Sequence, residues 1–527
     1  MRVLLLCDGG EQLGVGHVMR SLALAEAAVA AGHDVVVAGH FEGSFVQGQL
    51  AAAPVEVVQL AAAADAGPGP TLELVQRFQP DVLHVDSYHV ADWFMGSFIL
   101  SSMEDGSFGR KPADVVIDPT FGAELSPRPD DGSTWLLRGS RYTPMRQRVM
   151  DARRRGEIDS AVAEARTEVG ETRTEVGDLA RSVLVVMGGT DPVGLAPAAV
   201  RLLASTGLPL EVTVIAVGEN AELVGAAALG TRLSLNILAP VDDLATMMAR
   251  HDLVISAAGT SVWELCCIGV PMAVVWAVDN QRVGYERVVA AGAALGLGGP
   301  ELGRPELGRD KRAVGLLRTA LTDSRVRADL VLAGRHVVDG LGAWRVVRTW
   351  EQALRLGPLP AVAVAGLVAR PVTLADSRQL WEWRNDPGTR ASSRHAEMVP
   401  WLQHLAWLES SLTREDRMLL VVEDPVNTVG PVGTVRWDLG SQGEWEVSVT
   451  VAPDRRGQSL ARPLLRAAEV ALSEVARSSG TDVTAYLAVV HVDNGASVRL
   501  FESSAYLPDL PPDPRGFMRF RKAARVA

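Results

Sequence analysis

The segment GVGHVMR, residues 14–20, follows the apolar stretch VLLLCDGG and places His17 in a glycine-containing turn. Glycine-containing turns that lead into a helix can bind oxyanions through free backbone N–H groups. An imidazole titrates near neutral pH, so a histidine beside a bound phosphate can deprotonate a water molecule. A lone histidine in a turn is more often a structural hydrogen-bonding group, and the neighbouring segments must decide between the two roles.

Three further segments end predicted strands with residues of the same kind. MGGTDP at Met187 and SAAGTSVWE at Ser256 offer glycines and hydroxyl groups where a helix begins. Glu264 follows one helical turn later, where a carboxylate can accept both ribose hydroxyls, and VDNQ at Val278 ends another strand. Each turn alone is explained by the backbone freedom of glycine, but their recurrence at strand ends favours a nucleotide site. The predicted binding residues here are Gly188, Gly189, Thr190, Gly259, Thr260, Ser261, Glu264, Asn280 and Gln281.

Another turn, RRGQSLA at Arg455, joins a strand to a helix near the end of the chain. Consecutive backbone N–H groups at a helix start, with arginine nearby, fit the pyrophosphate of a thioester cofactor. An acceptor amine must lose a proton before it attacks a thioester. Glu446 on the preceding strand is the first candidate base, and His491 is the second.

These turns must be positioned by strands, and the apolar pattern supplies them. Residues 1 to about 147 alternate short apolar strands with helices, which predicts a parallel sheet with crossover helices. A second series of the same kind begins at RSVLVVMGG. Two successive doubly wound domains place a cleft at the carboxyl ends of both sheets, in the two-Rossmann arrangement called GT-B. From about residue 371, tryptophan-rich helices, three strands and a helix from Leu460 predict an α+β domain with an antiparallel sheet.

The domain organisation follows from these patterns. We predict Rossmann-like domains at 1–150 and 182–357, an α+β domain at 371–527, and linkers at 151–181 and 358–370. The first linker is charged and contains a duplicated heptad, RTEVGET and RTEVGDL. Gly170 and Gly177 interrupt any helix in it, and it lacks an apolar face.

Composition excludes several classes of protein. A net charge of −12 provides no basic surface for nucleic acid. Three cysteines without metal-ligand spacing argue against disulfides and structural zinc, so we expect no metal. The apolar stretch LPAVAVAGLVA at Leu359 has about half the length of a bilayer span. We therefore expect a cytoplasmic protein without membrane insertion.

Together, the N-terminal segments resemble a family of pseudaminic-acid pathway hydrolases (PseG-like), relatives of MurG-type glycosyltransferases that remove UDP from a 2,4-diacetamido-2,4,6-trideoxy sugar. The resemblance covers residues 1 to about 350 and rests on GVGHVMR, HVDSYHV, GSRYTPMR, VVMGGTDP, SAAGTSVWE and VDNQ. It implies that the family motifs fall on Gly16, His17, Arg20, Asp86, Tyr88, Gly139, Tyr142 and Arg146.

This resemblance implies metal-independent, inverting hydrolysis at the anomeric carbon, with His17 directing the attacking water. Asp86 then holds the water or a sugar hydroxyl, or is a satisfied carboxylate at a strand end. Tyr142 and Arg146 shape the sugar pocket, and Gly16, Arg20 and Tyr88 contribute to substrate binding.

The C-terminal segments resemble the GNAT acetyltransferases. Motif A, R/Q-x-x-G-x-G/A, falls on Arg456, Ser459 and Ala461, with Gly457 and Gln458 between them. Ser459 replaces the first glycine, which we expect to be tolerated if its φ stays negative.

The segment VHVDNGASVRLFESSAYLP is similar to the second CoA-contacting segment of that superfamily and implies that Asn494, Ala496 and Ser497 lie near the pantetheine arm. Phe501 stands where many members have an acidic tyrosine, and Tyr506 is a poor substitute. WEWRNDPGTR is closest to the N-acetyltransferase branch of the pseudaminic pathway (PseH-like).

The combined prediction is a bifunctional enzyme, a monomer or homodimer that takes acetyl-CoA and a UDP-amino sugar. It acetylates the 4-amino group of a UDP-4-amino-4,6-dideoxy-N-acetylhexosamine and then hydrolyses UDP from the product. The resulting 2,4-diacetamido-2,4,6-trideoxyhexose would supply pseudaminic (nonulosonic) acid biosynthesis. Two alternatives remain: a GT-B glycosyltransferase fused to an N-acyltransferase, and a protein with one non-catalytic binding half.

Overall fold

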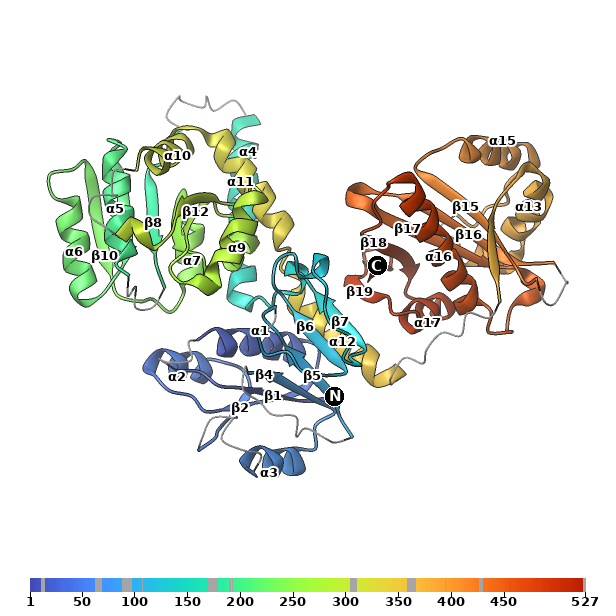
Figure 1. The fold of residues 1–527 in the computed structure, drawn as a ribbon, viewed down its shortest axis with the longest axis horizontal. Coiled ribbons are helices and arrows are strands. Elements are labelled where there is room, and N and C mark those ends of the chain that lie inside the picture. The colour runs from blue at the N-terminus through green and yellow to red at the C-terminus, as the bar shows by residue number, and fades with distance from the viewer. Residues whose placement is uncertain are drawn as a thin grey trace. The chain divides into compact units, whose positions relative to one another are not determined.

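The computed structural model describes residues 1–10, 15–61, 69–87, 97–106, 108–168, 179–188, 191, 193–303, 310–357, 366–393, 395–425 and 430–524. These residues form two compact units, Met1–Trp350 and Glu351–Ala527. Their secondary structure confirms the predicted fold class, two Rossmann-like parallel sheets followed by an α+β domain (Figure 1).

The first sheet is parallel throughout and is built from the short apolar segments near the N-terminus. Its strands are β1 (Arg2–Cys7), β2 (Asp34–Gly39), β3 (Glu56–Gln59), β4 (Val82–Asp86), β5 (Ile99–Met103), β6 (Val115–Asp118) and β7 (Trp135–Arg138). Within the described residues their order is β3-β2-β1-β4-β5-β6-β7. The strand order reverses between β1 and β4, which is where open α/β sheets bind their ligands.

Both faces of this sheet are covered by helices. Leu4 and Leu6 of β1 point to one face and pack in a core that includes Leu74 of α3 (Gly69–Phe78). Helix α1 (Gly16–Ala30) lies on the opposite face (Figure 1), and α2 (Ser44–Ala51) follows β2. The uninterrupted burial of residues 3–7 along β1 therefore reflects burial on both faces of the sheet.

The second sheet repeats this architecture. Its strands are β8 (Ser182–Val186), β9 (Leu210–Ile215), β10 (Leu233–Leu238), β11 (Leu253–Ala257), β12 (Met272–Val275) and β13 (Leu295–Gly298). They are parallel and ordered β10-β9-β8-β11-β12-β13 where the chain is described, so the reversal falls between β8 and β11. The helices of this part are α4 (Gln147–Glu168), α5 (Leu195–Ser205), α6 (Gly218–Ala228), α7 (Leu244–Ala249), α8 (Ser261–Ile268), α9 (Asp279–Ala290), α10 (Lys311–Thr322), α11 (Ser324–Val337) and α12 (Gly342–Leu356).

Helix α4 corrects part of the linker prediction. Residues 147–168 are helical, so helix occupies the first half of the segment interpreted as a linker at 151–181. Val149 and Ala152 are fully buried in the core between the second sheet and its helices, which supplies the apolar contacts that the sequence pattern did not show. Residues 169–178, with most of the duplicated heptad, lie outside the described residues.

Helix α12 brings the second series back to the first sheet. Trp350 near its end is fully buried, and its indole Nε1 donates a hydrogen bond to Oγ of Ser101 on β5 at 2.9 Å. Arg345, also fully buried, donates to the backbone oxygen of Arg141 at 2.6 Å. Helix α12 thus supplies contacts that join the two Rossmann-like parts of the first unit.

The second unit contains a mixed sheet. Its strands are β14 (Val368–Pro371), β15 (Arg417–Glu423), β16 (Pro431–Leu439), β17 (Glu444–Val451), β18 (Ala485–His491), β19 (Leu507–Leu510) and β20 (Phe517–Ala523). Neighbouring strands pair antiparallel except β17 and β18. The helices are α13 (Ser377–Asn385), α14 (Pro387–Ala391), α15 (Trp401–Leu412), α16 (Ala461–Ser479) and α17 (Gly495–Ser503).

The boundaries of this unit differ from the predicted linker at 358–370. Strand β14 already begins at Val368, inside that segment. Before the predicted linker, Gln352 of α12 is fully buried, and its Nε2 donates to the backbone oxygens of Glu502 and Tyr506 at 3.1 and 3.0 Å. The residues of α12 after Trp350 therefore pack within the second unit. Residues 358–365, between α12 and β14, lie outside the described residues.

Candidate functional site

His17 and Asp86 meet at the point where the first sheet reverses its strand order. His17 lies in the first turn of α1, which follows β1, and Asp86 is the last residue of the neighbouring β4. Nδ1 of His17 lies 2.6 Å from Oδ1 of Asp86, and the two residues are 8% and 1% exposed. The carboxylate fixes the ring orientation and, by accepting from Nδ1–H, selects the tautomer with Nε2 as the proton acceptor.

Arg20 supports this pair. Its Nε and Nη2 donate to Oδ2 and Oδ1 of Asp86 at 3.0 and 2.9 Å, and its Nη1 donates to Asp105 at 2.6 Å. Burial favours the neutral form of Asp86, but Arg20 and His17 outweigh it and hold the pKa of that carboxyl well below its usual range. The structure thus brings the predicted substrate ligand Arg20 to His17, where its guanidinium is engaged with carboxylates.

Asp105 is a member of this cluster that the sequence analysis missed. It lies just after β5, a strand that the apolar pattern did not predict because its residues Ser101 and Ser102 are polar yet fully buried. The signal that would have found it is an acidic residue after a strand adjacent to β4.

The starts of α1 and α8 lie side by side. A Cβ atom on Gly16 would lie 3.8 Å from Cγ2 of Thr260, although the two residues come from different sheets. Neither helix has a side-chain cap: the N-cap residues are Val15 and Thr260, and neither side chain accepts from the first turn. Two sets of backbone N–H groups are therefore directed to the same region, with the positive ends of two helix dipoles.

The start of α5 is different. The carboxylate of Asp191 accepts from the backbone N–H groups of Leu195 and Ala196 at 2.9 and 2.8 Å. The predicted phosphate-binding turn at Met187 therefore precedes a helix whose first N–H groups are already hydrogen-bonded to the carboxylate of Asp191. Gly188 has a left-handed φ of 85°, and Gly189 and Thr190 lie outside the described residues.

The residues after β11 and β12 also come together. A Cβ atom on Gly259 would lie 3.6 Å from Nε2 of Gln281, and Oε1 of Gln281 accepts from the backbone N–H of Ala277 at 2.8 Å. Ser261 is the first residue of α8, and Glu264 lies in the first turn. Burial raises the pKa of Glu264 above its usual value, while Arg148 and Arg146 oppose that change. The side chain of Asn280 is outside the described part of the structure.

Arg146 and Tyr142, predicted to shape the sugar pocket, are both buried. Nε of Arg146 lies 2.6 Å from Oε1 of Glu26 on α1, so this guanidinium joins α1 to the start of α4. Tyr142 lies in a short 3₁₀ turn, Ser140–Tyr142. Their role toward a sugar stays a prediction, as does that of Tyr88, which lies outside the described residues.

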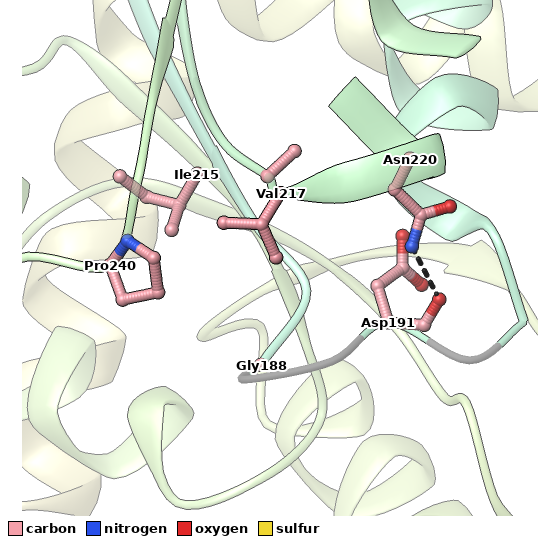
Figure 2. Close-up of a pocket in the computed structure, with 7 residues that line it drawn as sticks. Gly188, Asp191, Ile215, Val217, Asn220 and Pro240 are labelled. Atoms are coloured by element: carbon pink, nitrogen blue, oxygen red, sulfur yellow. Dashed lines mark hydrogen bonds between the residues drawn. The ribbon is translucent and has the colours of Figure 1, made fainter. Parts of the chain in front are cut away.

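A pocket opens at the carboxyl ends of β8, β9 and β10 (Figure 2). It is lined by Gly188, Asp191, Ile215, Ala216, Val217, Asn220 and Pro240. Nδ2 of Asn220 donates to the backbone oxygen of Asp191 at 2.9 Å. The pocket combines aliphatic walls with an amide and a carboxylate.

In the second unit, the turn at residues 456–460 precedes α16. Gly457 and Ser459 both have left-handed backbone, with φ of 77° and 57°. The condition under which we expected this serine to be tolerated, a negative φ, is therefore not met: Ser459 adopts a left-handed conformation that glycine reaches more easily, at a steric cost. The N-cap residue of α16, Leu460, provides no side-chain cap, so the turn leaves backbone N–H groups for an anion.

Arg456 lies at the start of this turn but is engaged elsewhere. Its Nη1 lies 2.7 Å from Oδ2 of Asp386, and its Nη2 donates to Oγ1 of Thr389 at 2.6 Å. Gln458 donates to the backbone oxygen of Asp454 at 3.1 Å. The backbone of the turn, including the start of α16 at Ala461, therefore remains the better-placed anion ligand.

The strands β17 and β18 separate beyond Glu446. Their parallel pairing covers only Glu444–Glu446 and Ala485–Leu487, although the strands continue to Val451 and His491. A gap between two parallel strands exposes backbone groups that a bound chain can pair with. Glu446 is half-buried at the start of this gap, and its role as a base stays a prediction.

The helix after β18 supplies a cap and a core residue. The side chain of Asn494 accepts from the backbone N–H of Ser497 at 3.1 Å and so caps α17. Phe501 packs in the core against Tyr506, with ring centroids 5.1 Å apart. The hydroxyl of Tyr506 donates to Glu469 at 3.1 Å, and burial raises the pKa of Tyr506 well above its usual value. Neither ring offers a proton to a thiolate.

Two broader searches complete the site description. Within the described part of the chain, His, Cys, Asp and Glu side chains form no group of three or more that could hold a metal ion. No described helix has both the length and the apolar composition needed to cross a membrane.

Comparisons with known proteins give a family match within the second unit. Residues 367–505 match the family described as acetyltransferase (GNAT) domain. Over 449 residues the chain is 20% identical to the uncharacterized protein MJ1062 of Methanocaldococcus jannaschii, covering 82% of this chain and 83% of that protein. Over 175 residues it is 30% identical to the spore coat polysaccharide biosynthesis protein SpsG of Bacillus subtilis, covering 32% of this chain and 48% of SpsG, so the match spans about half of that relative. Among solved structures, MurG of Acinetobacter baumannii aligns with 67% of this chain and 99% of its own, at 16% identity and a TM-score of 0.44.

Proposed function

We propose that the first unit is a UDP-sugar hydrolase in which His17 directs water onto the anomeric carbon. The observation that supports this most strongly is the meeting of two uncapped helix starts, at Gly16 and Thr260, beside the His17–Asp86 pair. Two helix N-termini attract a diphosphate and stabilise it as a leaving group. The similarity to a spore coat polysaccharide biosynthesis protein supports a sugar substrate.

In the hydrolytic step, the oxygen of a water molecule attacks the anomeric carbon while the water gives a proton to Nε2 of His17. The bond between that carbon and the β-phosphate oxygen breaks, and UDP leaves with the bonding electrons. Attack opposite the leaving group inverts the anomeric configuration. Asp86 holds Nδ1 and stabilises the imidazolium as it forms, so it acts through His17 rather than on the sugar.

The nucleotide lies along the second sheet. The uracil ring occupies the pocket lined by Val217, Asn220 and Pro240 (Figure 2), and the ribose hydroxyls bind the carboxylate of Glu264. The diphosphate lies at the start of α8, next to Ser261. Of the remaining proposed ligands, Gly188, Gly259 and Gln281 follow strands at this edge of the sheet. Gly189, Thr190 and the side chain of Asn280 lie outside the described residues and stay proposed ligands.

The second unit transfers an acetyl group from acetyl-CoA to the 4-amino group of a UDP-linked 4-amino-4,6-dideoxy-N-acetylhexosamine. The turn at Gly457 binds the pyrophosphate, and the gap between β17 and β18 receives the thioester arm. Glu446 accepts the proton of the amine, whose nitrogen attacks the thioester carbonyl. The carbon–sulfur bond breaks, and the thiolate takes its proton from water because Phe501 has no hydroxyl.

The two reactions are consecutive: acetylation of the sugar nucleotide, then release of UDP. The product is a free 2,4-diacetamido-2,4,6-trideoxyhexose for pseudaminic acid or a related nonulosonic acid. Two active centres on one chain avoid the need to capture the acetylated intermediate from dilute solution.

The test is to incubate the purified protein with candidate UDP-4-amino sugars and acetyl-CoA and to follow CoA and UDP release, with products identified by mass and NMR. We expect both products from the native protein, and Glu446→Gln is expected to lose CoA release while still releasing UDP from a preacetylated substrate. Sugar transfer to an alcohol in place of water would identify a glycosyltransferase. Failure to release CoA with every amino sugar would contradict the acetyltransferase assignment.

A further inference from the structure

Asp105 completes a network behind His17. Its Oδ1 accepts from Nη1 of Arg20 at 2.6 Å, and Arg20 also binds both carboxylate oxygens of Asp86. Nη2 of Arg20 lies 3.2 Å from Nδ1 of His17. Arg20 is therefore placed between two carboxylates and directly beside the imidazole.

The position of Asp105 is set by its own turn. Its backbone N–H and carbonyl exchange hydrogen bonds with Phe108 at 3.0 and 3.1 Å, and Gly106 has a φ of 64°. The N–H of Gly106 also donates to Oδ1 of Asp118 at 3.3 Å. The carboxylate of Asp105 thus meets Arg20 from a turn that the backbone fixes independently.

We infer that Asp105 is a positioning residue that controls, through Arg20, how readily His17 accepts the proton of the attacking water. This inference rests on the proposed hydrolase function. With His17 neutral, Asp86, Asp105 and Arg20 carry one net negative charge, and the network becomes neutral when His17 takes a proton. Removing the charge of Asp105 therefore disfavours the imidazolium, and removing the charge of Arg20 favours it.

Other titratable groups surround the network. They are Cys7 on β1, Asp8 after it, His84 on β4, Lys111 after β5, and the Glu26–Arg146 pair joining α1 to α4. Burial raises the pKa of the Cys7 thiol and lowers the pKa of His84 to about 4, so both are neutral near pH 7. Nζ of Lys111 donates to the backbone oxygen of Ser87 at 3.0 Å, and Asp8 accepts from the N–H of His40 at 2.8 Å.

The test compares Asp105→Asn and Arg20→Gln with the native protein by NMR titration of the His17 ring, assigned from the spectrum of a His17→Gln variant. We expect the midpoint to move down by about half a pH unit in Asp105→Asn and up in Arg20→Gln, because the removed charges are opposite. Asp34→Asn, at the exposed amino end of β2, makes the same charge change away from the site and should leave the midpoint unmoved. If Arg20→Gln does not fold, Arg20→Lys keeps the charge and should keep the midpoint.

The same variants are then assayed for UDP release, and the acid limb of the kcat/KM profile should move in step with the NMR midpoint. An unmoved midpoint in Asp105→Asn, with only lower thermal stability, would overturn the inference and leave Asp105 a structural anchor. The titration needs no substrate, so the native protein's failure to release UDP would contradict the hydrolase proposal alone.

Discussion

Cγ2 of Thr260 lies 3.8 Å from the position that a Cβ atom on Gly16 would occupy, so two helix starts from different sheets meet at one point. The backbone of Gly16 is not left-handed, and an added methyl group would make only an ordinary contact. Neither backbone strain nor a clash of a first methyl group therefore requires glycine here, and only a larger side chain would press against Thr260.

Gly16→Ala should fold with near-native stability, whereas Gly16→Val should lower the affinity for UDP about tenfold because its branched side chain separates the two helix starts. Isothermal titration with UDP measures this, with thermal unfolding of both variants as the control. Native-like UDP affinity in Gly16→Val would show that the diphosphate lies elsewhere.

His17→Ala should reduce UDP release by about a thousandfold, since a positioned general base contributes roughly that much. CoA release in the same sample should be unchanged, because acetyl transfer uses residues of the second unit. Asp86→Asn should lose less activity than His17→Ala, because the ring stays in place without its charged partner. Undiminished hydrolysis by His17→Ala would show that the imidazole takes no part in the reaction.

Ser459→Gly should stabilise the protein by about 1 kcal/mol, because a left-handed φ of 57° is costly for serine and not for glycine. It should also lower the KM for acetyl-CoA by making the turn easier to form. Ser478→Gly in the helix α16 is the matched control and should destabilise. Chemical denaturation measures the free energy of unfolding of both variants. A change in the same direction in both would contradict this explanation.

At pH values above the usual pKa of glutamate, Glu264→Gln should stabilise the protein. It should also weaken UDP binding about tenfold. Burial raises the pKa of Glu264 in the folded protein, so the native chain loses stability as pH rises from the unfolded pKa through the raised folded value. The gain in the variant should therefore be present at pH 8 and absent at pH 4. The measurement is the free energy of unfolding at both pH values, with Glu219→Gln in α6 as the control. An equal gain in stability at pH 4 and pH 8 would refute the prediction.

The strand ends that carry His17 and Asp86 were predictable because β1 is a continuous apolar run and β4 is apolar except for His84 and its last residue, Asp86. Strand β5 was not, since Ser101 interrupts its pattern and finds its partners far away, in His84 and in Trp350 of α12. Long-range hydrogen bonds of this kind leave no local signal in the sequence. Asp105 was missed for the same reason, because its neighbouring strand was missed.

In the second unit, the three predicted strands and the helix from Leu460 correspond to β15, β16, β17 and α16. The sheet also contains β14, β18, β19 and β20, and the parallel pairing of β17 with β18 departs from the predicted antiparallel sheet. The partners of Arg456 were not predictable, because Asp386 and Thr389 approach it from a helix about 70 residues earlier. The backbone of Ser459 was not predictable either, since serine favours other conformations and only the tertiary structure imposes a left-handed one.

The carboxylate of Asp191 has one more consequence. By occupying the amino end of α5, it leaves a negative charge at one side of the second sheet, while the amino end of α8 on the other side stays positive. In the proposed binding mode, a nucleotide that turns its uncharged base toward α5 and its diphosphate toward α8 meets a favourable charge at both ends. A carboxylate that lines the base pocket would thereby also set the direction in which the ligand binds.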